Sequence, residues 1–292
     1  MTKILIIGSS GQLGTELQST APTSTDFNLS FFNRNELDIT TASGIALISS
    51  LKPSIVINAS AYTKVDLAES EQALAFASNH TGVEQLAKAC AAINCRLIHI
   101  STDFVFDGNN SKPYEPLDKT NPLSIYGESK LKGEQAITNT PNLSHVIIRT
   151  SWVYSAAGQN FVKTMLKLFT QRPDLNVVYD QIGSPTWAKD LAQVIWAFVD
   201  KNELTGCYHY TNAGVASWYD FATAIQEEAN ALGLIDSHCS ISAIPSSAYP
   251  TPAKRPHFSV LNCQSLEHDL QITRPHWRQS LRNMLKELSH DT

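Results

Sequence analysis

Tyr126 stands four residues before Lys130 in the run of residues 124–130, Ser-Ile-Tyr-Gly-Glu-Ser-Lys. Side chains four apart on a helix lie on the same face. A tyrosine has an unperturbed pKa of about 10, and a neighbouring ammonium group is the simplest way to lower it. The pair predicts a tyrosine that exchanges protons with help from a lysine. Because this spacing also occurs by chance on solvated helices, the pair needs support from the rest of the chain.

A glycine-rich loop at residues 8–14, Gly-Ser-Ser-Gly-Gln-Leu-Gly, follows an apolar run at residues 4–7 and precedes a predicted helix. Backbone amides at a helix N-terminus can face a pyrophosphate where no side chain intervenes. Glycines also serve tight turns, but this junction of strand and helix favours a dinucleotide site. With the tyrosine and lysine, it predicts a nicotinamide-dependent reductase. The predicted cofactor contacts in the loop are Gly8, Ser10, Gly11, Gln12, Leu13 and Gly14.

Arg34 lies just after the second predicted strand, about twenty residues beyond the loop, where the protein would contact the adenosine ribose. No carboxylate stands immediately there, and a guanidinium can pair with a ribose phosphate, so the residue favours NADPH over NADH. The alternative is a solvated arginine that Glu36 partly neutralises. The loops at sheet edges are also predicted to border the adenosine, although each can be read as a plain turn. These residues are Asp38, Ile39, Ala59, Ala61 and Tyr62.

Thr102 and Asp103 follow the apolar strand predicted at residues 97–100. A parallel sheet presents ligand-binding residues at its carboxyl edge. The Thr102 hydroxyl could therefore bind a substrate oxygen alongside Tyr126, and Asp103 could hold a sugar hydroxyl. The alternative is that both residues only cap the next segment, since their types are preferred caps.

Alternating apolar runs and helical segments predict an α/β fold, a Rossmann-type doubly wound parallel sheet with a smaller C-terminal substrate-binding lobe. We predict a dinucleotide-binding domain at 1–150, to which 176–200 return, and a substrate-binding lobe at 151–175 and 201–292. The predicted strands are 4–7, 29–32, 55–58, 97–100, 146–149 and 177–179. The predicted helices include 71–93, 160–169, 218–232 and 278–288.

The composition excludes several other classes of protein. The 292 residues carry a formal net charge of −5 with no basic block, which argues against nucleic acid as a partner. No apolar stretch is long enough to span a bilayer and no export signal is visible, so we expect no membrane partner. Five scattered cysteines suggest neither a disulfide framework nor a zinc site. We expect a cytoplasmic protein with reduced thiols.

The glycine loop, the Ser/Thr after the strand and the tyrosine–lysine pair occur here in the order found in the extended short-chain dehydrogenase/reductase family. Within it, the chain closely resembles the dTDP-4-dehydrorhamnose reductases over nearly its full length. The matching segments are 11–14, 58–62, 65–66, 101–108, 126–130, 149–154, 160–161, 180–186, 217–218 and 253–256.

The resemblance implies reduction of the 4-keto group of dTDP-4-dehydro-L-rhamnose to dTDP-L-rhamnose by NADPH, or by NADH, for rhamnose-containing polysaccharide. It implies that Tyr126 donates the proton, that Lys130 holds the nicotinamide ribose and lowers the tyrosine pKa, and that Thr102 assists at the carbonyl. A dTDP-sugar is thus the expected partner. The residues expected at the substrate are Thr102, Asp103, Trp152, Asn160 and Arg255; the last would meet the diphosphate or else brace a loop.

The resemblance leaves two questions open: whether a metal binds, and whether the protein has another activity. Members of the family can bind Mg²⁺ at a homodimer contact through glutamates, one of which Glu16 matches. Lys189 stands where the second glutamate would lie, so we assign no metal ligand and read Glu16 as a first-turn helix carboxylate. Another nucleotide-sugar reductase, epimerase or dehydratase is an alternative, although Phe104 replaces the glutamate that such dehydratases use. A non-catalytic NADP-binding subunit, like that of methionine adenosyltransferase, is another.

Overall fold

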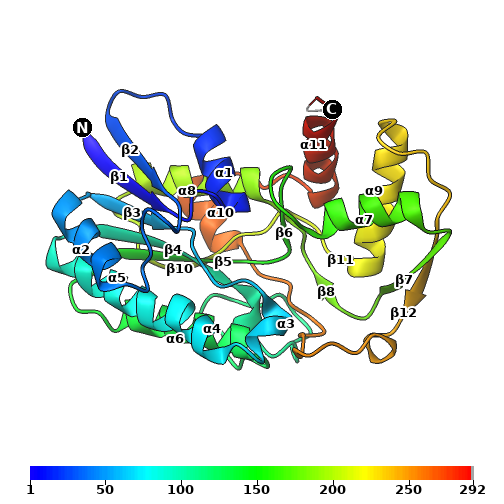
Figure 1. Ribbon diagram of the computed structural model, residues 1–292, viewed down its shortest axis with the longest axis horizontal. Helices are drawn as coiled ribbons and strands as arrows, with labels where there is room; N and C mark the ends of the chain where they lie inside the picture. The colour runs from blue at the N-terminus through cyan, green and yellow to red at the C-terminus, as the bar shows by residue number, and fades with distance from the viewer. Residues whose placement is uncertain (291–292) are drawn as a thin grey trace.

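The computed structural model describes residues 1–290, which form a sheet-based α/β lobe and a smaller lobe beside it (Figure 1). Six parallel strands make the main sheet in the order β10-β5-β4-β3-β1-β2. The predicted α/β class with a doubly wound parallel sheet is confirmed. The strands are β1 (Thr2–Ile7), β2 (Phe27–Phe32), β3 (Ile55–Asn58), β4 (Arg96–Thr102), β5 (His145–Thr150) and β10 (Gly206–His209).

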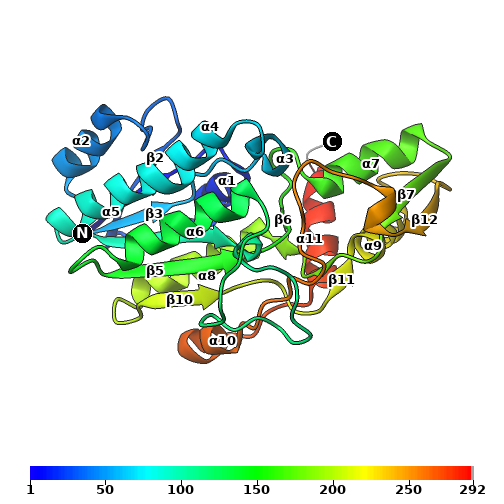
Figure 2. The same cartoon turned by 90° about the horizontal axis from the view of Figure 1, so that it is seen from below.

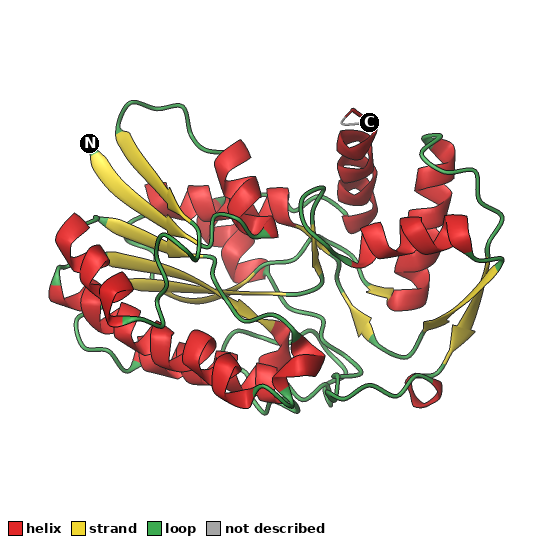
Figure 3. Ribbon diagram, viewed as in Figure 1, coloured by secondary structure: helices red, strands yellow, loops and turns green. Residues whose placement is uncertain are grey.

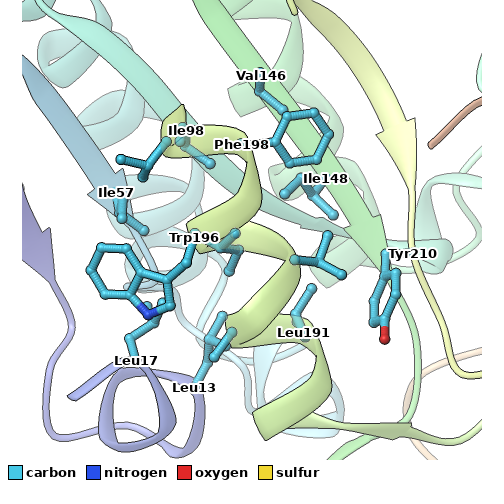
Figure 4. Packing of buried hydrophobic residues seen from close by; sticks show 14 of the residues in the cluster. Leu13, Leu17, Ile57, Ile98, Val146, Ile148, Leu191, Trp196, Phe198 and Tyr210 are labelled. Atoms are coloured by element: carbon cyan, nitrogen blue, oxygen red, sulfur yellow. The ribbon is translucent and has the colours of Figure 1, made fainter. Parts of the chain in front are cut away.

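Helices cover both faces of this sheet (Figure 2). Successive side chains of a strand point to opposite faces, so Ile4 and Ile6 of β1 join one core cluster, and Leu5 and Ile7 join another. Burial on both faces explains why the strands read as continuous apolar runs. One face carries α1 (Gln12–Ser19) and α8 (Ala188–Asp200), whose packing Figure 4 shows; the other carries α2 (Ala42–Leu51), α5 (Gly82–Ala92) and α6 (Ile125–Thr138).

The predicted sixth strand of the sheet is wrong. Residues 177–179 overlap β7 (Asp174–Val178), which pairs in parallel with β12 (Ser240–Ile244) in a separate two-stranded sheet. The sixth strand of the main sheet is β10, and its sequence Gly-Cys-Tyr-His has no apolar run. Because β10 lies at the edge of the sheet, it needs less apolar surface than a central strand.

The smaller lobe has its own hydrophobic core. Three helices build it together with β7 and β12, and Figure 3 shows them as a group apart from the main sheet. They are α7 (Phe161–Gln171), α9 (Trp218–Ala231) and α11 (Trp277–His290), which confirm the predicted helices at 160–169, 218–232 and 278–288 within a few residues. Side chains cap two of them: Asn160 accepts from the Lys163 amide, and Ser217 forms a capping box with Asp220.

The main sheet also takes segments from the C-terminal half of the chain. We predict that residues 176–200 belong to the first domain. Within that range, α8 packs against α1 and the sheet, whereas β7 belongs to the smaller lobe. Residues 206–209, predicted to lie in the substrate lobe, form β10 of the main sheet. The helix α10 (Gln264–Leu270) also packs on the sheet core. The other domain boundaries stay predictions.

Short elements complete the fold. The helix predicted at 71–93 consists of α4 (Gln72–Phe76), a π-helical segment (Ala77–Thr81) and α5. The others are α3 (Val65–Ala68), β6 (Val153–Tyr154), β8 (Ile182–Gly183), β9 (Thr186–Trp187), β11 (Ala216–Ser217) and 3₁₀ turns at Asp103–Val105 and Ser246–Ala248. None of the helices within residues 1–290 is long and apolar enough to cross a membrane.

Candidate active site

A cavity of about 670 Å³ opens at the carboxyl edge of the main sheet and is lined from both lobes. Its size is that of an ordinary small-molecule site. Residues from the glycine loop and from α6 lie on its wall together. The predicted site residues that line it are Gly8, Ser10, Gly11, Gln12, Leu13, Arg34, Asp38, Ile39, Ala59, Ala61, Thr102, Asp103, Tyr126, Lys130, Trp152, Asn160 and Arg255.

The three glycines of the loop have two different roles. Gly8 and Gly14 lie against neighbouring backbone, whereas Gly11 leaves room for a ligand. Gly8 has φ +90°, and a Cβ there would lie 2.7 Å from the Ser60 nitrogen. A Cβ on Gly14 would lie 2.1 Å from the Gly8 carbonyl oxygen, so this glycine serves the packing of α1 on β1 rather than lining the cavity. Gly11 is the N-cap of α1, and no side chain caps that helix. The first-turn amides therefore suit a pyrophosphate, and the loop fits a dinucleotide.

Arg34 is held beside the cavity by Asp38. Its Nε donates to Asp38 Oδ2 at 3.1 Å, while 70% of the Arg34 side chain remains exposed. Glu36, the expected neutralising group, instead accepts from the Asn33 amide at 2.9 Å. The carboxylate that partly neutralises Arg34 is thus that of Asp38, four residues later in the same loop. The two terminal nitrogens of the guanidinium remain suited to an anionic ligand.

Tyr62 does not lie on the cavity wall. Its hydroxyl donates to Glu71 Oε2 at 2.6 Å, and its amide donates to Asn79. These contacts turn the phenol away, so its predicted cofactor contact gains no support from its placement.

Tyr126 lies on α6 with 9% of its surface exposed. Burial raises the pKa of its phenol to about 12; the nearby Thr102 hydroxyl lowers the pKa and the Asp103 charge raises it. The predicted lowering of this pKa by the Lys130 ammonium is therefore wrong in this structure. The side chains share a helix face, but the ammonium is directed at other partners.

Lys130 is almost completely buried, with 2% of its surface exposed. Its Nζ donates to the Ile100 carbonyl oxygen at 2.6 Å and lies 3.3 Å from His99 Nε2. Burial lowers the pKa of Lys130 to about 8, although the Glu134 carboxylate acts in the opposite direction. A lysine with such a pKa changes protonation near neutral pH.

Thr102 is the last residue of β4. It caps the next segment and also lies where it could contact a substrate. Its hydroxyl accepts from the Phe104 amide at 3.2 Å, as a cap, and donates to Asp103 Oδ1 at 3.0 Å, while the residue also lines the cavity. Asp103 is 2% exposed, and burial raises its pKa to about 6. Its Oδ2 has no hydrogen-bond partner within 3.5 Å among residues 1–290, although the Ser259 hydroxyl lies near enough to lower the carboxyl pKa. A buried acceptor of this kind suits a donor on a ligand.

Trp152 adopts a left-handed backbone conformation, with φ +49°. Its ring stacks on Trp218, with centroids 3.6 Å apart and planes 7° apart. A Cβ on Gly183 would lie 2.7 Å from the same ring, so only glycine fits there. Strained backbone held by its surroundings is common at functional sites. Trp218 lines the cavity but was not among the predicted site residues, although residues 217–218 are a matching segment.

Asn160 and Arg255 line the cavity, yet both bind other parts of the protein. Asn160 Nδ2 donates to Gln12 Oε1 at 2.9 Å, which joins α7 to the glycine loop. The Arg255 guanidinium makes a two-pronged pair with Asp66, at 3.1 and 2.7 Å. Arg255 thus braces a loop through Asp66, as the alternative for it states. The substrate contacts of Asn160 and Arg255 stay predictions.

The two residues considered for a metal site are engaged elsewhere. Glu16 is buried and accepts from Ser155 at 2.6 Å and from Ser19 at 3.1 Å. Lys189 pairs with Glu287 at 2.5 Å. Within residues 1–290, no group of three or more His, Cys, Asp or Glu side chains could hold a metal ion. Nothing in these contacts supports Mg²⁺.

The chain matches the family described as RmlD substrate binding domain over residues 1–290. It is 41% identical to the dTDP-4-dehydrorhamnose reductase of Escherichia coli K12 over 295 residues, covering 98% of this chain and 97% of the relative. A crystal structure of a Clostridium acetobutylicum dTDP-4-dehydrorhamnose reductase has a TM-score of 0.92 and 36% identity, with 99% and 100% of the chains covered. The Bacillus anthracis enzyme, in complex with NADP, has a TM-score of 0.92 and 35% identity, with 98% and 100% covered. The chain therefore belongs to the dTDP-4-dehydrorhamnose reductase family.

Proposed function

We propose that this protein is a dTDP-4-dehydrorhamnose reductase, which uses NADPH to reduce the 4-keto group of dTDP-4-dehydro-L-rhamnose to the hydroxyl of dTDP-L-rhamnose. The observation that carries the proposal is one cavity lined by the glycine loop and by Thr102, Tyr126 and Lys130. The names of the relatives and the NADP complex of the Bacillus anthracis enzyme support it.

Tyr126 is the proton donor in this proposal. Bound NADPH supplies the hydride to the 4-keto carbon. Negative charge then grows on the carbonyl oxygen, and the Tyr126 hydroxyl neutralises it by giving its proton. Burial holds the pKa of Tyr126 at about 12, so the phenol is protonated at neutral pH, as this step requires. The nearby Thr102 hydroxyl lowers the pKa of the phenol and so offsets part of the effect of burial.

Lys130 and the surrounding side chains complete the site. Lys130 is proposed to hold the nicotinamide ribose, so replacing it with methionine should damage both the chemistry and cofactor binding. Asp103 Oδ2 and the Trp152 ring are proposed to contact the sugar, with Asn160 and Arg255 farther along the substrate. Arg34 is proposed to favour NADPH over NADH. The five free cysteines fit the cytoplasm proposed from the sequence, and a homodimer stays a proposal.

The alternatives lack a supporting observation. Phe104 stands where the dehydratases carry a glutamate, and its ring packs edge-on against Tyr126 with centroids 5.5 Å apart. An apolar ring has no proton to move in an elimination. A non-catalytic role would not require Thr102, Tyr126 and Lys130 to share one cavity wall.

The test is turnover of the purified chain with dTDP-4-dehydro-L-rhamnose, followed by loss of reduced-nicotinamide absorbance with NADPH and with NADH. Tyr126→Phe should lower kcat by about 10²–10⁴-fold, the usual contribution of a general acid. The variant should still bind NADPH, because only a hydroxyl is removed. An unaltered rate would remove Tyr126 from the mechanism.

A further inference from the structure

A buried polar chain leads from the main sheet to the catalytic lysine. Asn58 Nδ2 on β3 lies 3.1 Å from His99 Nδ1 on β4, and His99 Nε2 lies 3.3 Å from Lys130 Nζ. Asn58 and His99 are completely buried, whereas Lys130 borders the cavity. The proposed reaction assigns no role to His99. Buried polar groups in such a chain constrain one another's proton positions.

Ser60 determines which way the Asn58 amide points. Asn58 Oδ1 accepts from the Ser60 amide at 3.1 Å and from its hydroxyl at 2.6 Å. A backbone N–H can only donate, so the amide atom that faces it must be the oxygen. The NH₂ group of Asn58 therefore faces His99 and donates to Nδ1. His99 Nδ1 consequently carries no proton.

The remaining proton of His99 must lie on Nε2. Burial, and then the charge of Lys130, lower the pKa of His99 well below its ordinary value, so the ring is neutral. A neutral imidazole with an unprotonated Nδ1 carries its hydrogen on Nε2. That N–H faces the Lys130 nitrogen.

This contact distinguishes the two forms of Lys130. An ammonium has three donors and no acceptor, so it opposes an N–H, whereas a neutral amine offers a lone pair to it. Both forms can donate to the Ile100 carbonyl oxygen. Burial already lowers the pKa of Lys130, and Glu134, the other charged group acting on it, is paired with Arg149 at 2.7 Å.

We propose that His99 is a positioning residue whose proton, fixed on Nε2 by Asn58, disfavours the ammonium form of Lys130. Its meaning for catalysis rests on the proposed function. After reduction, a proton passes from the Lys130 ammonium through ribose hydroxyls or water to the Tyr126 phenolate, and the amine left on Lys130 accepts from His99 Nε2–H. A proton from solvent then restores the ammonium. A lysine held as a permanent cation could not make this exchange near neutral pH.

The proton position can be measured in the unmodified protein. Nitrogen-15 NMR of histidine-labelled protein distinguishes protonated from unprotonated ring nitrogens, and the His99 signals are those missing from His99→Phe. We expect an unprotonated Nδ1 and a protonated Nε2 across neutral pH. A proton on Nδ1 would overturn the proposal, and this measurement does not depend on turnover.

A double-mutant cycle tests the effect on Lys130. In Asn58→Asp, a carboxylate replaces the NH₂ donor, draws the His99 proton to Nδ1 and leaves Nε2 to accept from the ammonium. The pKa of Lys130, followed by NMR of labelled lysine and assigned with Lys130→Met, should rise by at least about one unit, the equivalent of one hydrogen bond. In the His99→Phe background the same change should have a clearly smaller effect. Equal shifts in both backgrounds would show direct charge attraction and overturn the role of His99.

The pH dependence of turnover gives a separate readout. If Lys130 resupplies the proton, the alkaline decline of kcat should move to higher pH in Asn58→Asp by the same shift as the lysine pKa. A lower kcat with an unmoved alkaline decline would assign His99 a merely structural role and overturn the proposal. Failure of the parent chain to reduce the sugar would instead refute the proposed function and leave the NMR results standing.

Discussion

The cavity has a side proposed for the nucleotide, at the glycine loop, and a side proposed for the substrate, at Trp152, Asn160 and Arg255. The two sides are built by different contacts. At the glycine loop, the tightest approach joins neighbours in sequence, since a Cβ on Gly14 would lie 2.1 Å from the Gly8 oxygen. On the substrate side, Arg255 binds Asp66 across 189 positions and Asn160 binds Gln12 across 148. Local contacts leave a motif in the sequence, whereas distant ones exist only once the chain has folded.

The largest expected effect is a difference in stability between alanine variants of two glycines in the glycine loop. Gly14→Ala places a Cβ against backbone atoms that cannot yield, so it should lower the free energy of unfolding by about 3 kcal/mol. Gly11→Ala is the matched control, because its Cβ would meet the Gly8 oxygen only at 3.4 Å. It should leave the free energy of unfolding within about 0.5 kcal/mol of the parent and weaken NADPH binding. Urea unfolding and cofactor titration measure the two effects; similar instability in both variants would contradict this assignment.

The next effect concerns Asp103, on the substrate side. Its pKa is raised from 3.8 to about 6 by burial, so between these values the folded protein binds more protons than the unfolded chain. The free energy of unfolding should therefore fall as pH rises through this window, by at most about 3 kcal/mol, and level off above it. Asp103→Asn should remove this contribution. Urea unfolding of both proteins at pH 4 and pH 7 provides the check, and identical pH dependence would show that the carboxyl titrates normally.

A smaller effect tests whether the two sides of the cavity are separate. Trp218→Ala removes the ring stacked on Trp152, a contact worth about 1 kcal/mol. The KM for the dTDP-sugar should rise by about five- to tenfold, with the Kd for NADPH unchanged. Trp218→Phe should recover part of the loss. If the NADPH Kd rose as much as the KM, the sides would not be separable.

The smallest effect is expected at Arg34, which is largely exposed. Arg34→Ala should weaken NADPH binding by about three- to fivefold and leave NADH binding unchanged, because exposed charges are screened by water and salt. Asp38→Asn is the opposite change, since it releases the guanidinium and should slightly strengthen NADPH binding. Titration of both cofactors at low and high salt measures this; an equal loss for NADH would remove Arg34 from phosphate recognition.

The sequence predicted the parts of the fold that depend on local pattern. β1 and β3 are buried on both faces, so their apolar runs were recognisable, whereas β10 is an edge strand without such a run. The glycine loop is recognisable because its glycines also form a local sequence pattern. Trp218 was missed because its partner Trp152 is distant in sequence and no spacing connects the two.

The spacing of Tyr126 and Lys130 predicted their shared helix but not their electrostatics. Four residues place two side chains on one face, but do not say where a flexible lysine directs its nitrogen. The Ile100 carbonyl oxygen, 30 positions away on β4, accepts from that nitrogen. The expected lowering of the Tyr126 pKa failed because burial, which depends on the whole fold, is the largest contribution.

The fate of the hydride shows directly whether this protein reduces the 4-keto group of the sugar. The purified chain should be incubated with dTDP-4-dehydro-L-rhamnose and NADPH deuterated at the transferring position of the nicotinamide, and the sugar product analysed by NMR and mass spectrometry. We expect dTDP-L-rhamnose with one deuterium at C4, formed in step with NADPH oxidation. Product without deuterium at C4, or a sugar left unreduced while NADPH stays bound, would contradict the proposed function.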